Sequence, residues 1–130
     1  HLAYNYMKSP YVVPMTYFYD EEEDYLIGYT SEGHKTMSMR HNPTVSVLVE
    51  EIDSLNQWKS VVVYGKFEQL SGTSAKAALH KFCEGLKKLV GNIGDKELKF
   101  LCDFSSKSDS EDPPIVYRIK IQEFTARSRQ

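Results

Sequence analysis

The sequence predicts one domain of mainly β structure, an antiparallel barrel of six strands that is closed or half closed. Three observations predict it. The 130 residues leave room for a single domain, residues 1–130. The chain has 9 Tyr and 6 Phe residues, and many of them fall in short runs with the two-residue period of a strand. Only one long segment has the spacing of an amphipathic helix. We therefore expect few helices, one longer and two short.

The first half of the chain predicts three strands. In Leu2–Tyr6, apolar residues alternate with others. The next run, Pro10–Tyr19, is apolar on both faces, which predicts a strand that is covered on both sides. Pro14 cannot donate to a ladder, so it predicts an edge, a bulge or a stretch that faces a ligand. The acids of 20–24 predict a solvated hairpin tip before the strand Tyr25–Thr30.

The middle of the chain predicts a short helix and a hairpin. Residues 31–42 change to a helical period, and Pro43 ends the helix because the residue before proline avoids the helical region. Strict alternation predicts strands at Thr44–Glu50 and Ser60–Leu70. The polar residues 51–59 predict the connection between them.

The second half predicts the long helix and the closing strand. Residues from Thr73 or Ser74 to Val90 place apolar side chains three and four apart, and Gly91 is expected to end this helix. Asp95 is expected to cap a second short helix. Serines, acids and prolines in 105–114 predict a mobile loop. The last strand is Ile115–Phe124, with Tyr117 and Ile119 among the inward residues and Val116 outward.

Composition excludes several classes of partner. The formal net charge is −2 and no long basic run occurs, which disfavours nucleic acid. No apolar run approaches the ~20 residues of a membrane span. Cys83 and Cys102 lack the spacing of a zinc site, and the four histidines lack metal-ligand spacing, so we expect no metal. Two reduced, buried thiols favour a cytoplasmic protein.

The segment Tyr29–Lys35 is the strongest candidate for a binding site. A strand runs here into the start of a helix, where backbone N–H groups and the positive end of the helix dipole face outward. Thr30, Ser31, His34 and Lys35 add donors and charge at the same place. This pattern favours a phosphate site. An ordinary capped turn with a solvated Lys35 is the alternative that the segment alone leaves open.

Three segments together resemble a known family. They are Pro10-Tyr11-Val12-Val13-Pro14-Met15, Gly33-His34-Lys35 shortly before Pro43, and Trp58-Lys59-Ser60-Val61-Val62-Val63-Tyr64-Gly65-Lys66. In this order and at these distances they resemble the FMN-binding split-barrel superfamily, and most closely the pyridoxamine 5′-phosphate oxidase-related proteins of the nitroimidazole-resistance type. The resemblance covers nearly all of residues 1–70, and the strand from Val116 is similar to the family's last strand.

The resemblance implies a homodimer of six-stranded Greek-key split barrels with two FMN molecules at the interface. By matching position, Tyr11, Val12, Val13 and Pro14 would line the isoalloxazine ring. Tyr29 and Thr30 would lie by the phosphoribityl chain, and His34 and Lys35 would hold the phosphate. Ser60 would form a hydrogen bond near the ring from the opposite strand. A solvent-facing hydroxyl at a strand start is the alternative for Ser60.

Two positions depart from the family's pattern. The turn that commonly reads Glu-Gly-Arg-Lys is Glu32-Gly33-His34-Lys35 here, so an always-charged guanidinium is replaced by an imidazole. Phosphate binding is therefore expected to be weaker or dependent on pH. Many relatives have a His-Ser pair where this chain has Gly28-Tyr29, so no histidine can act near a flavin from that position.

These features favour an FMN-dependent oxidoreductase that passes electrons from NADH or NADPH to a small acceptor. No catalytic side chain is assigned, because the chemistry would belong to the cofactor. The alternative is a non-catalytic dimer that carries or senses flavin or haem, and deazaflavin is a further cofactor to test. Oxidation of pyridoxamine phosphate is disfavoured, because Arg127 and Arg129 lie in no recognisable phosphate motif.

Overall fold

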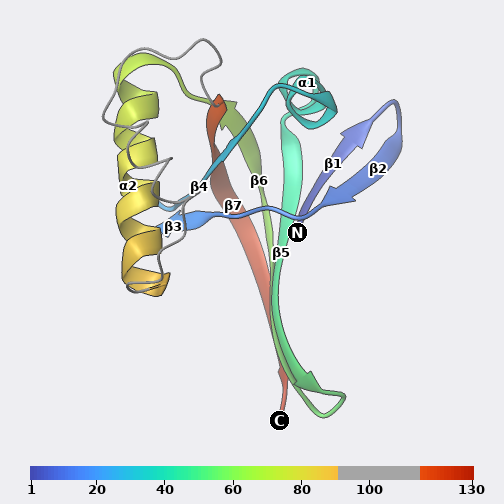
Figure 1. The fold of residues 1–130 in the computed structure, drawn as a ribbon. Helices are drawn as coiled ribbons and strands as arrows, with labels where there is room; N and C mark the ends of the chain where they lie inside the picture. Colours follow the sequence, from blue (N-terminus) through green and yellow to red (C-terminus); the bar gives the residue numbers. More distant parts are fainter. Residues whose placement is uncertain (91–114) are drawn as a thin grey trace. The chain divides into compact units, whose positions relative to one another are not determined.

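The computed structural model describes residues 1–90 and 115–130 (Figure 1). Its contacts divide the chain into two compact units. The first unit comprises His1–Met15, Gly33–Glu68 and Ile119–Gln130, and the second comprises Thr16–Glu32 and Gln69–Arg118. The described elements are β1 (Leu2–Tyr6), β2 (Ser9–Val13), β3 (Phe18–Asp20), β4 (Tyr25–Thr30), α1 (His34–His41), β5 (Thr44–Ser54), β6 (Gln57–Gln69), α2 (Gly72–Val90) and β7 (Ile115–Arg129). The sequence prediction of one domain stays a prediction.

In the first unit, the strands lie in the order β2-β1-β5-β6-β7. The pairs β1–β2, β1–β5 and β5–β6 are antiparallel, and Val13, Leu2, Val47 and Val63 form one row across the four strands. Alternation along the strands places one set of side chains in the core, which Met39 of α1 completes. The buried apolar side chains of this unit are Leu2, Tyr4, Met39, Val45, Val47, Val63, Phe67 and Ile119.

A two-residue turn joins β1 to β2, since Tyr6 pairs with Ser9. Met7 and Lys8 both have positive φ, 46° and 66°, which is the geometry of a type I′ turn. Such turns favour Asn-Gly, and residues with a Cβ are strained there. The sequence therefore contains no turn signal that would predict this hairpin.

The hairpin β5–β6 is longer than the sequence indicates. Residues 51–59, expected as a polar connection, continue the ladder to the pair Ser54–Gln57, so that prediction was wrong. Polar side chains suit these positions because both faces of the arm are exposed. Glu51 lies opposite Lys59, and their side chains form an ion pair at 2.8 Å. Both are exposed, so this pair contributes little to stability.

In the second unit, the strand order is β7-β4-β3, and α2 packs against β3 and β4 (Figure 1). The helix forms as predicted, starting at Gly72, because its apolar side chains fall on one face. Its core cluster consists of Ile27, Ala78, Leu79, Phe82, Cys83 and Val116. Cys83 is buried as expected. Cys102, the helix expected after Asp95, the end expected at Gly91 and the loop 105–114 lie outside the described residues.

The single strand expected at Pro10–Tyr19 is wrong, because β2 ends at Val13 and β3 begins at Phe18. Pro14 follows β2 directly and lacks the N–H that a ladder needs. This break accounts for seven described strands where the sequence predicts six. β2 is the edge strand of the sheet, and Pro14 lies directly beyond its end, outside the ladder.

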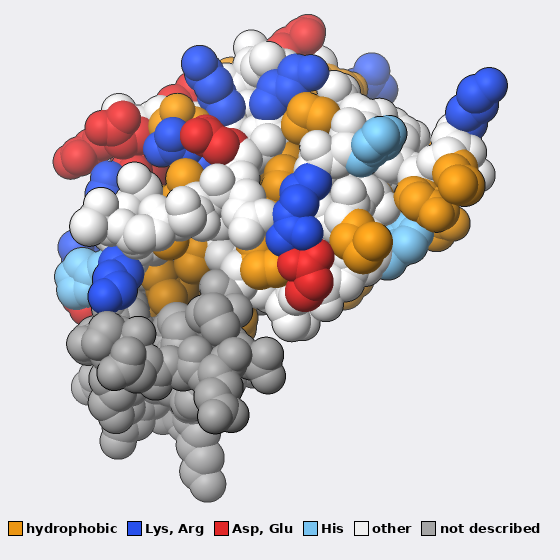
Figure 2. Space-filling model, turned by 90° about the horizontal axis from the view of Figure 1, so that it is seen from above, with side chains coloured by type: hydrophobic (Ala, Val, Ile, Leu, Met, Phe, Trp, Pro, Cys, Tyr) orange, Lys and Arg blue, Asp and Glu red, His pale blue; other side chains and the backbone are white. Residues whose placement is uncertain are grey.

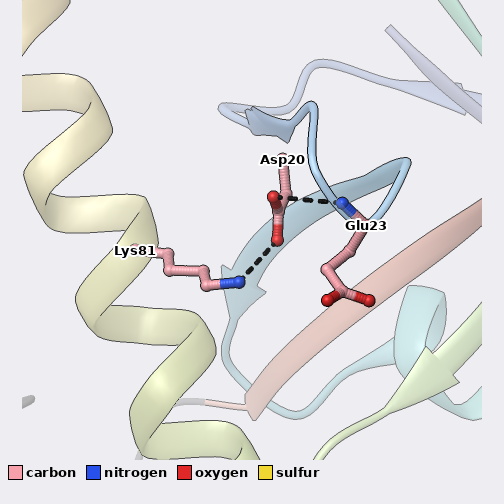
Figure 3. A network of polar contacts seen from close by, with 3 residues as sticks. All are labelled: Asp20, Glu23 and Lys81. Carbon is pink, nitrogen blue, oxygen red and sulfur yellow. Dashed lines mark hydrogen bonds and ion pairs between the residues drawn. The ribbon is translucent and has the colours of Figure 1, made fainter.

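Two further predictions are corrected in the second unit. Asp20, expected in a solvated tip, is buried, and its carboxylate accepts hydrogen bonds from Lys81 Nζ at 2.9 Å and from Glu23 N at 3.4 Å (Figure 3). Val116, expected on the outer face of β7, is buried in the cluster with α2, because apolar neighbours lie on that face too. β7 itself extends beyond Phe124 to Arg129.

Candidate functional site

The candidate site is centred on the start of α1. Gly33 is the residue before the helix, with extended backbone. Its N–H donates to Thr36 Oγ1 at 3.0 Å, and Thr36 Oγ1 donates to the Gly33 carbonyl at 2.9 Å. The Met37 N–H also donates to the Gly33 carbonyl, at 3.1 Å. These bonds close the first turn, so the cap differs from the Thr30 or Ser31 cap that the sequence allows.

Three tyrosine rings surround the imidazole of His34, the first residue of α1. Tyr4 and Tyr11 are paired across the β1–β2 hairpin and stack at 5.6 Å between ring centroids. The His34 ring lies 4.5 Å from Tyr6, 4.9 Å from Tyr11 and 5.8 Å from Tyr4. On the part of the surface formed by β1, β2 and α1, Figure 2 shows histidine and hydrophobic side chains next to one another.

Tyr4 is the buried member of this cluster. Its hydroxyl lies 3.0 Å from Nδ1 of His34. Burial raises the pKa of Tyr4 above its ordinary value, and the neighbouring Tyr11 adds to this. The hydroxyl therefore keeps its proton at neutral pH. Tyr4 and Tyr6 were not among the predicted site residues, and the alternation of Leu2, Tyr4 and Tyr6 on one strand face was the signal that pointed to them.

Lys35 is half-buried next to His34, and burial lowers the pKa of its ammonium group. Among the described residues, no carboxylate forms an ion pair with Lys35. The lysine thus carries its charge into a partly desolvated place beside the positive end of a helix.

The predicted ring-binding residues lie at the edge of the first unit. Tyr11 and Val12 of β2 are 40% and 65% exposed, and Pro14 is exposed. Val13 is half-buried and lies in the row of Leu2 and Val47. An edge strand with exposed apolar side chains has surface that a flat ring can cover. The structure brings Tyr11 together with His34, with 4.9 Å between the ring centroids.

Ser60 lies on β6 opposite Glu50, three pairs along the ladder from Val47. At about 3.3 Å per residue, this is on the order of 10 Å from the row that contains Val13. Ser60 is half-buried, and it is not at a strand start because β6 begins at Gln57. It lines a groove of about 400 Å³. The groove's residues are Val49, Glu50, Glu51, Lys59, Ser60, Val61, Ala126, Arg127 and Ser128.

Tyr29 and Thr30, expected beside the phosphoribityl chain, belong to the second unit. The Tyr29 ring meets the Phe82 ring edge to face at 5.4 Å, so it packs on the core cluster of that unit. Thr30 is half-buried, and its hydroxyl donates to the Ser31 carbonyl at 3.3 Å. Their role toward a cofactor stays a prediction.

Packing against Tyr117 in the second unit leaves no room for a side chain at Gly28. A Cβ at this position would lie 2.6 Å from the hydroxyl oxygen of Tyr117, closer than real side chains approach. Tyr117 is itself buried, and burial raises its pKa to about 12. A histidine at position 28 is therefore incompatible with Tyr117 in this place, which accounts for one of the two departures from the family's pattern.

Two absences concern the described residues alone. In residues 1–90 and 115–130, no three His, Cys, Asp or Glu side chains lie together in a way that could hold a metal ion. No helix in the same ranges is long and apolar enough to cross a membrane.

Comparison with known proteins gives a family and a fold. The family model described as pyridoxamine 5′-phosphate oxidase matches residues 1–128. The uncharacterized protein RA0666 of Rhizobium meliloti (strain 1021) is 42% identical over 65 residues, which are 50% of this chain and 42% of that protein. The chain thus spans less than half the length of this relative.

Two solved structures are similar over almost the whole chain. A FAD-binding protein from Mesorhizobium loti is 28% identical with a TM-score of 0.72, over 99% of this chain and 82% of that one. HutZ, the heme storage protein from Vibrio cholerae, is 14% identical with a TM-score of 0.63, over 98% and 83%. At 14% identity, the similarity to HutZ shows the fold alone.

Proposed function

The chain belongs to the pyridoxamine 5′-phosphate oxidase family and has its split-barrel fold, and from this premise we propose that it binds FMN. The phosphate would lie at the start of α1, held by His34, Lys35 and backbone N–H groups. The observation that carries the proposal is Lys35, a half-buried cation without a carboxylate partner among the described residues.

A phosphate supplies what this place lacks. Burial makes the charged form of Lys35 costly, and a nearby dianion would offset that cost. The N–H groups of the first helical turn have no partner within the helix and favour an anion for the same reason. Nothing lies within 4 Å of a Cβ built on Gly33, so there is open space at the backbone next to the helix start. These residues therefore fit a phosphate.

The flavin ring would lie against the exposed edge strand β2. Tyr11, Val12, Val13 and Pro14 offer an apolar and aromatic surface for it. Ser60 would contribute a hydroxyl from the groove on β6. Tyr29 and Thr30 remain the residues proposed for the phosphoribityl chain, on the strength of their positions in the sequence.

When bound, FMN would supply the redox chemistry that moves electrons from NADH or NADPH to a small acceptor. The chain's own residues would bind the phosphate, orient the ring and exclude water from it. None of them has to act as an acid or base. We assign the protein to the flavin-dependent oxidoreductases on this basis, and the nitroimidazole-resistance type stays the expected subtype.

We further propose a homodimer with the cofactor at the interface. The first unit exposes large apolar side chains that solvent does not favour. They are Tyr6, Met7, Tyr11, Val12, Met37, Ile52, Leu55, Tyr64 and Phe124. A second copy would cover part of this surface. Sedimentation at micromolar concentration checks this, and a 15.0 kDa species would contradict it.

The alternative is a carrier or sensor of flavin or haem that performs no turnover. The exposed imidazole of His34 favours keeping haem among the candidates, because histidine is a common haem ligand. The heme storage protein HutZ shares the fold, which supports the same choice. Addition of NADH or NADPH separates the two functions. A flavin that bleaches rapidly favours the oxidoreductase, and one that stays oxidised favours the carrier.

The test of flavin binding is an absorption spectrum of the purified protein, taken before and after incubation with FMN and gel filtration. Flavin bands that remain with the protein are expected. A colourless protein that retains no added FMN would contradict the proposal, and haem and deazaflavin would then be tested in the same way.

A further inference from the structure

The contact between Tyr4 and His34 determines more than the packing of two rings. The Tyr4 side chain is 4% exposed, whereas the His34 side chain is exposed. The hydroxyl and Nδ1 are 3.0 Å apart, which is within hydrogen-bond distance. Either atom could be the donor, and the two choices place the imidazole proton on different nitrogens.

The surroundings of Tyr4 decide between the two choices. In the described part of the chain, His34 is the one hydrogen-bond partner of the Tyr4 hydroxyl. If Nδ1 carried the proton and donated it, the O–H of a buried tyrosine would have no protein acceptor, which is unfavourable. If the hydroxyl donates to Nδ1, its single donor is satisfied. Nδ1 is then unprotonated, and the proton lies on Nε2 at the other edge of the ring.

We propose that Tyr4 is a positioning residue that fixes the neutral imidazole of His34 in the tautomer with its proton on Nε2, so that this edge of the ring offers a hydrogen-bond donor to phosphate. This inference rests on the proposed FMN site. It gives the departure at position 34 a physical meaning, because the position that commonly holds arginine still offers a hydrogen-bond donor here. Lys35 and the helix start supply positive charge toward the phosphate at the same place.

The remaining rings support the orientation. Tyr6 meets the imidazole edge to face and Tyr11 lies tilted against it. The Tyr4 hydroxyl on Nδ1 and the two neighbouring rings together favour one orientation of the imidazole. Preorganised donors lose less entropy when a ligand binds.

Long-range ¹H–¹⁵N correlation spectra of the labelled protein near pH 8 test the inference directly, because they distinguish protonated from unprotonated ring nitrogens. The His34→Gln variant identifies the His34 signals among those of the four histidines. The expected result is a single Nε2–H tautomer in the wild-type protein and a mixture of tautomers in Tyr4→Phe. The control Tyr11→Phe also loses one hydroxyl of the cluster, and it is expected to leave the tautomer unchanged.

A proton on Nδ1 in the wild-type protein, or an unchanged tautomer in Tyr4→Phe, overturns the inference. The wild-type measurement does not depend on Tyr4→Phe, so it decides the matter even if that variant is unstable. Titration with inorganic phosphate and with FMN then tests the proposed function separately. A shift of the Nε2 signal supports the donor role. An unchanged signal contradicts the phosphate site and the donor role, and it leaves the tautomer assignment intact.

In the same titrations, Tyr4→Phe is expected to weaken FMN binding by roughly 2- to 10-fold, the range of one neutral hydrogen bond. An affinity equal to that of the wild-type protein, in a variant whose tautomers are mixed, overturns the claim that the tautomer matters for binding.

Discussion

The Tyr4 hydroxyl lies 3.0 Å from Nδ1 of His34, although the two residues are 30 positions apart in the chain. This contact joins the β1–β2 hairpin to the first residue of α1 within the first unit. Since Lys35 follows His34 directly, the hairpin and the helix start together define the place where we propose that phosphate binds.

Replacing Lys35 by Met is expected to have opposite effects on stability and binding. Burial lowers the pKa of Lys35, so the folded protein carries its charge at a cost near pH 7. Lys35→Met removes this cost and should stabilise the ligand-free protein, by less than about 1 kcal/mol because the side chain is partly exposed. FMN binding should weaken at the same time. Urea unfolding and FMN titration measure the two effects.

The dependence of this effect on pH has a defined sign. The folded-state pKa of Lys35 lies below its ordinary value of 10.5, so the unfolded chain binds more protons between these two values. The wild-type protein therefore gains stability relative to Lys35→Met as pH rises through this interval. Lys120 is exposed, so Lys120→Met serves as the control. A stability difference that does not change between pH 7 and pH 10.5 would contradict the desolvation of Lys35.

Asp20→Asn is expected to destabilise the second unit by about 1 kcal/mol at pH 7, a value reduced for the partial exposure of Lys81. The hydrogen bond from Lys81 is the main cause of the lowered pKa of Asp20. Its contribution is present above pH 3.8 and is lost as pH falls through the lower folded-state value. Urea unfolding at pH 7 and pH 3 should show that the free energy of unfolding falls less on acidification in Asp20→Asn than in the wild-type protein. Equal losses in Asp20→Asn and in the neighbouring Glu21→Gln would argue against this pair.

Replacing Met7-Lys8 by Asn-Gly should stabilise the β1–β2 hairpin by about 1 to 2 kcal/mol, because both residues have positive φ. Chemical denaturation of the two proteins checks the prediction. The Tyr4–His34 contact should be unchanged, since the Tyr6–Ser9 pair separates the turn from Tyr4. A variant that is less stable than the wild-type protein would show that the turn differs from type I′.

Gly28→Ala should destabilise the protein by about 1 to 3 kcal/mol, since the new methyl group would overlap Tyr117. Gly33→Ala is the matched control, because nothing lies within 4 Å of a Cβ there and its φ is extended. We expect that variant to lose less than about 1 kcal/mol, from the weaker helix cap alone. Similar losses at both positions would contradict the role of Tyr117.

The sequence predicts those parts of the fold that follow from local periodicity. The apolar spacing of α2 and the alternation of Leu2 and Tyr4 agree with the structure because each segment buries one face. The break after Val13 was visible in Pro14, but an apolar pattern on both faces outweighed it. The long β5–β6 arm was missed because residues 51–59 are mostly polar and exposed, with Ile52 opposite Trp58 as the one apolar pair in that part of the ladder.

Non-local contacts limited the prediction of the site. His34 and Lys35 were named from a local motif and a resemblance, whereas Tyr4 and Tyr6 meet His34 because α1 packs against β1. Tyr11 joins them through the pairing of β1 with β2, and no Asn-Gly turn predicted that pairing. The sequence also does not show why position 28 needs glycine. Tyr117 is 89 residues away in the chain, and its position depends on the sheet.

Titration of the protein with FMN and with riboflavin, which lacks the phosphate, tests the central claim most directly. Flavin fluorescence gives both affinities. We expect the wild-type protein to prefer FMN by about 10-fold or more, and Lys35→Ala to lose most of this preference while its riboflavin affinity stays the same. Equal affinities for the two flavins, or a loss in Lys35→Ala that is the same for both, would contradict a phosphate site at the start of α1.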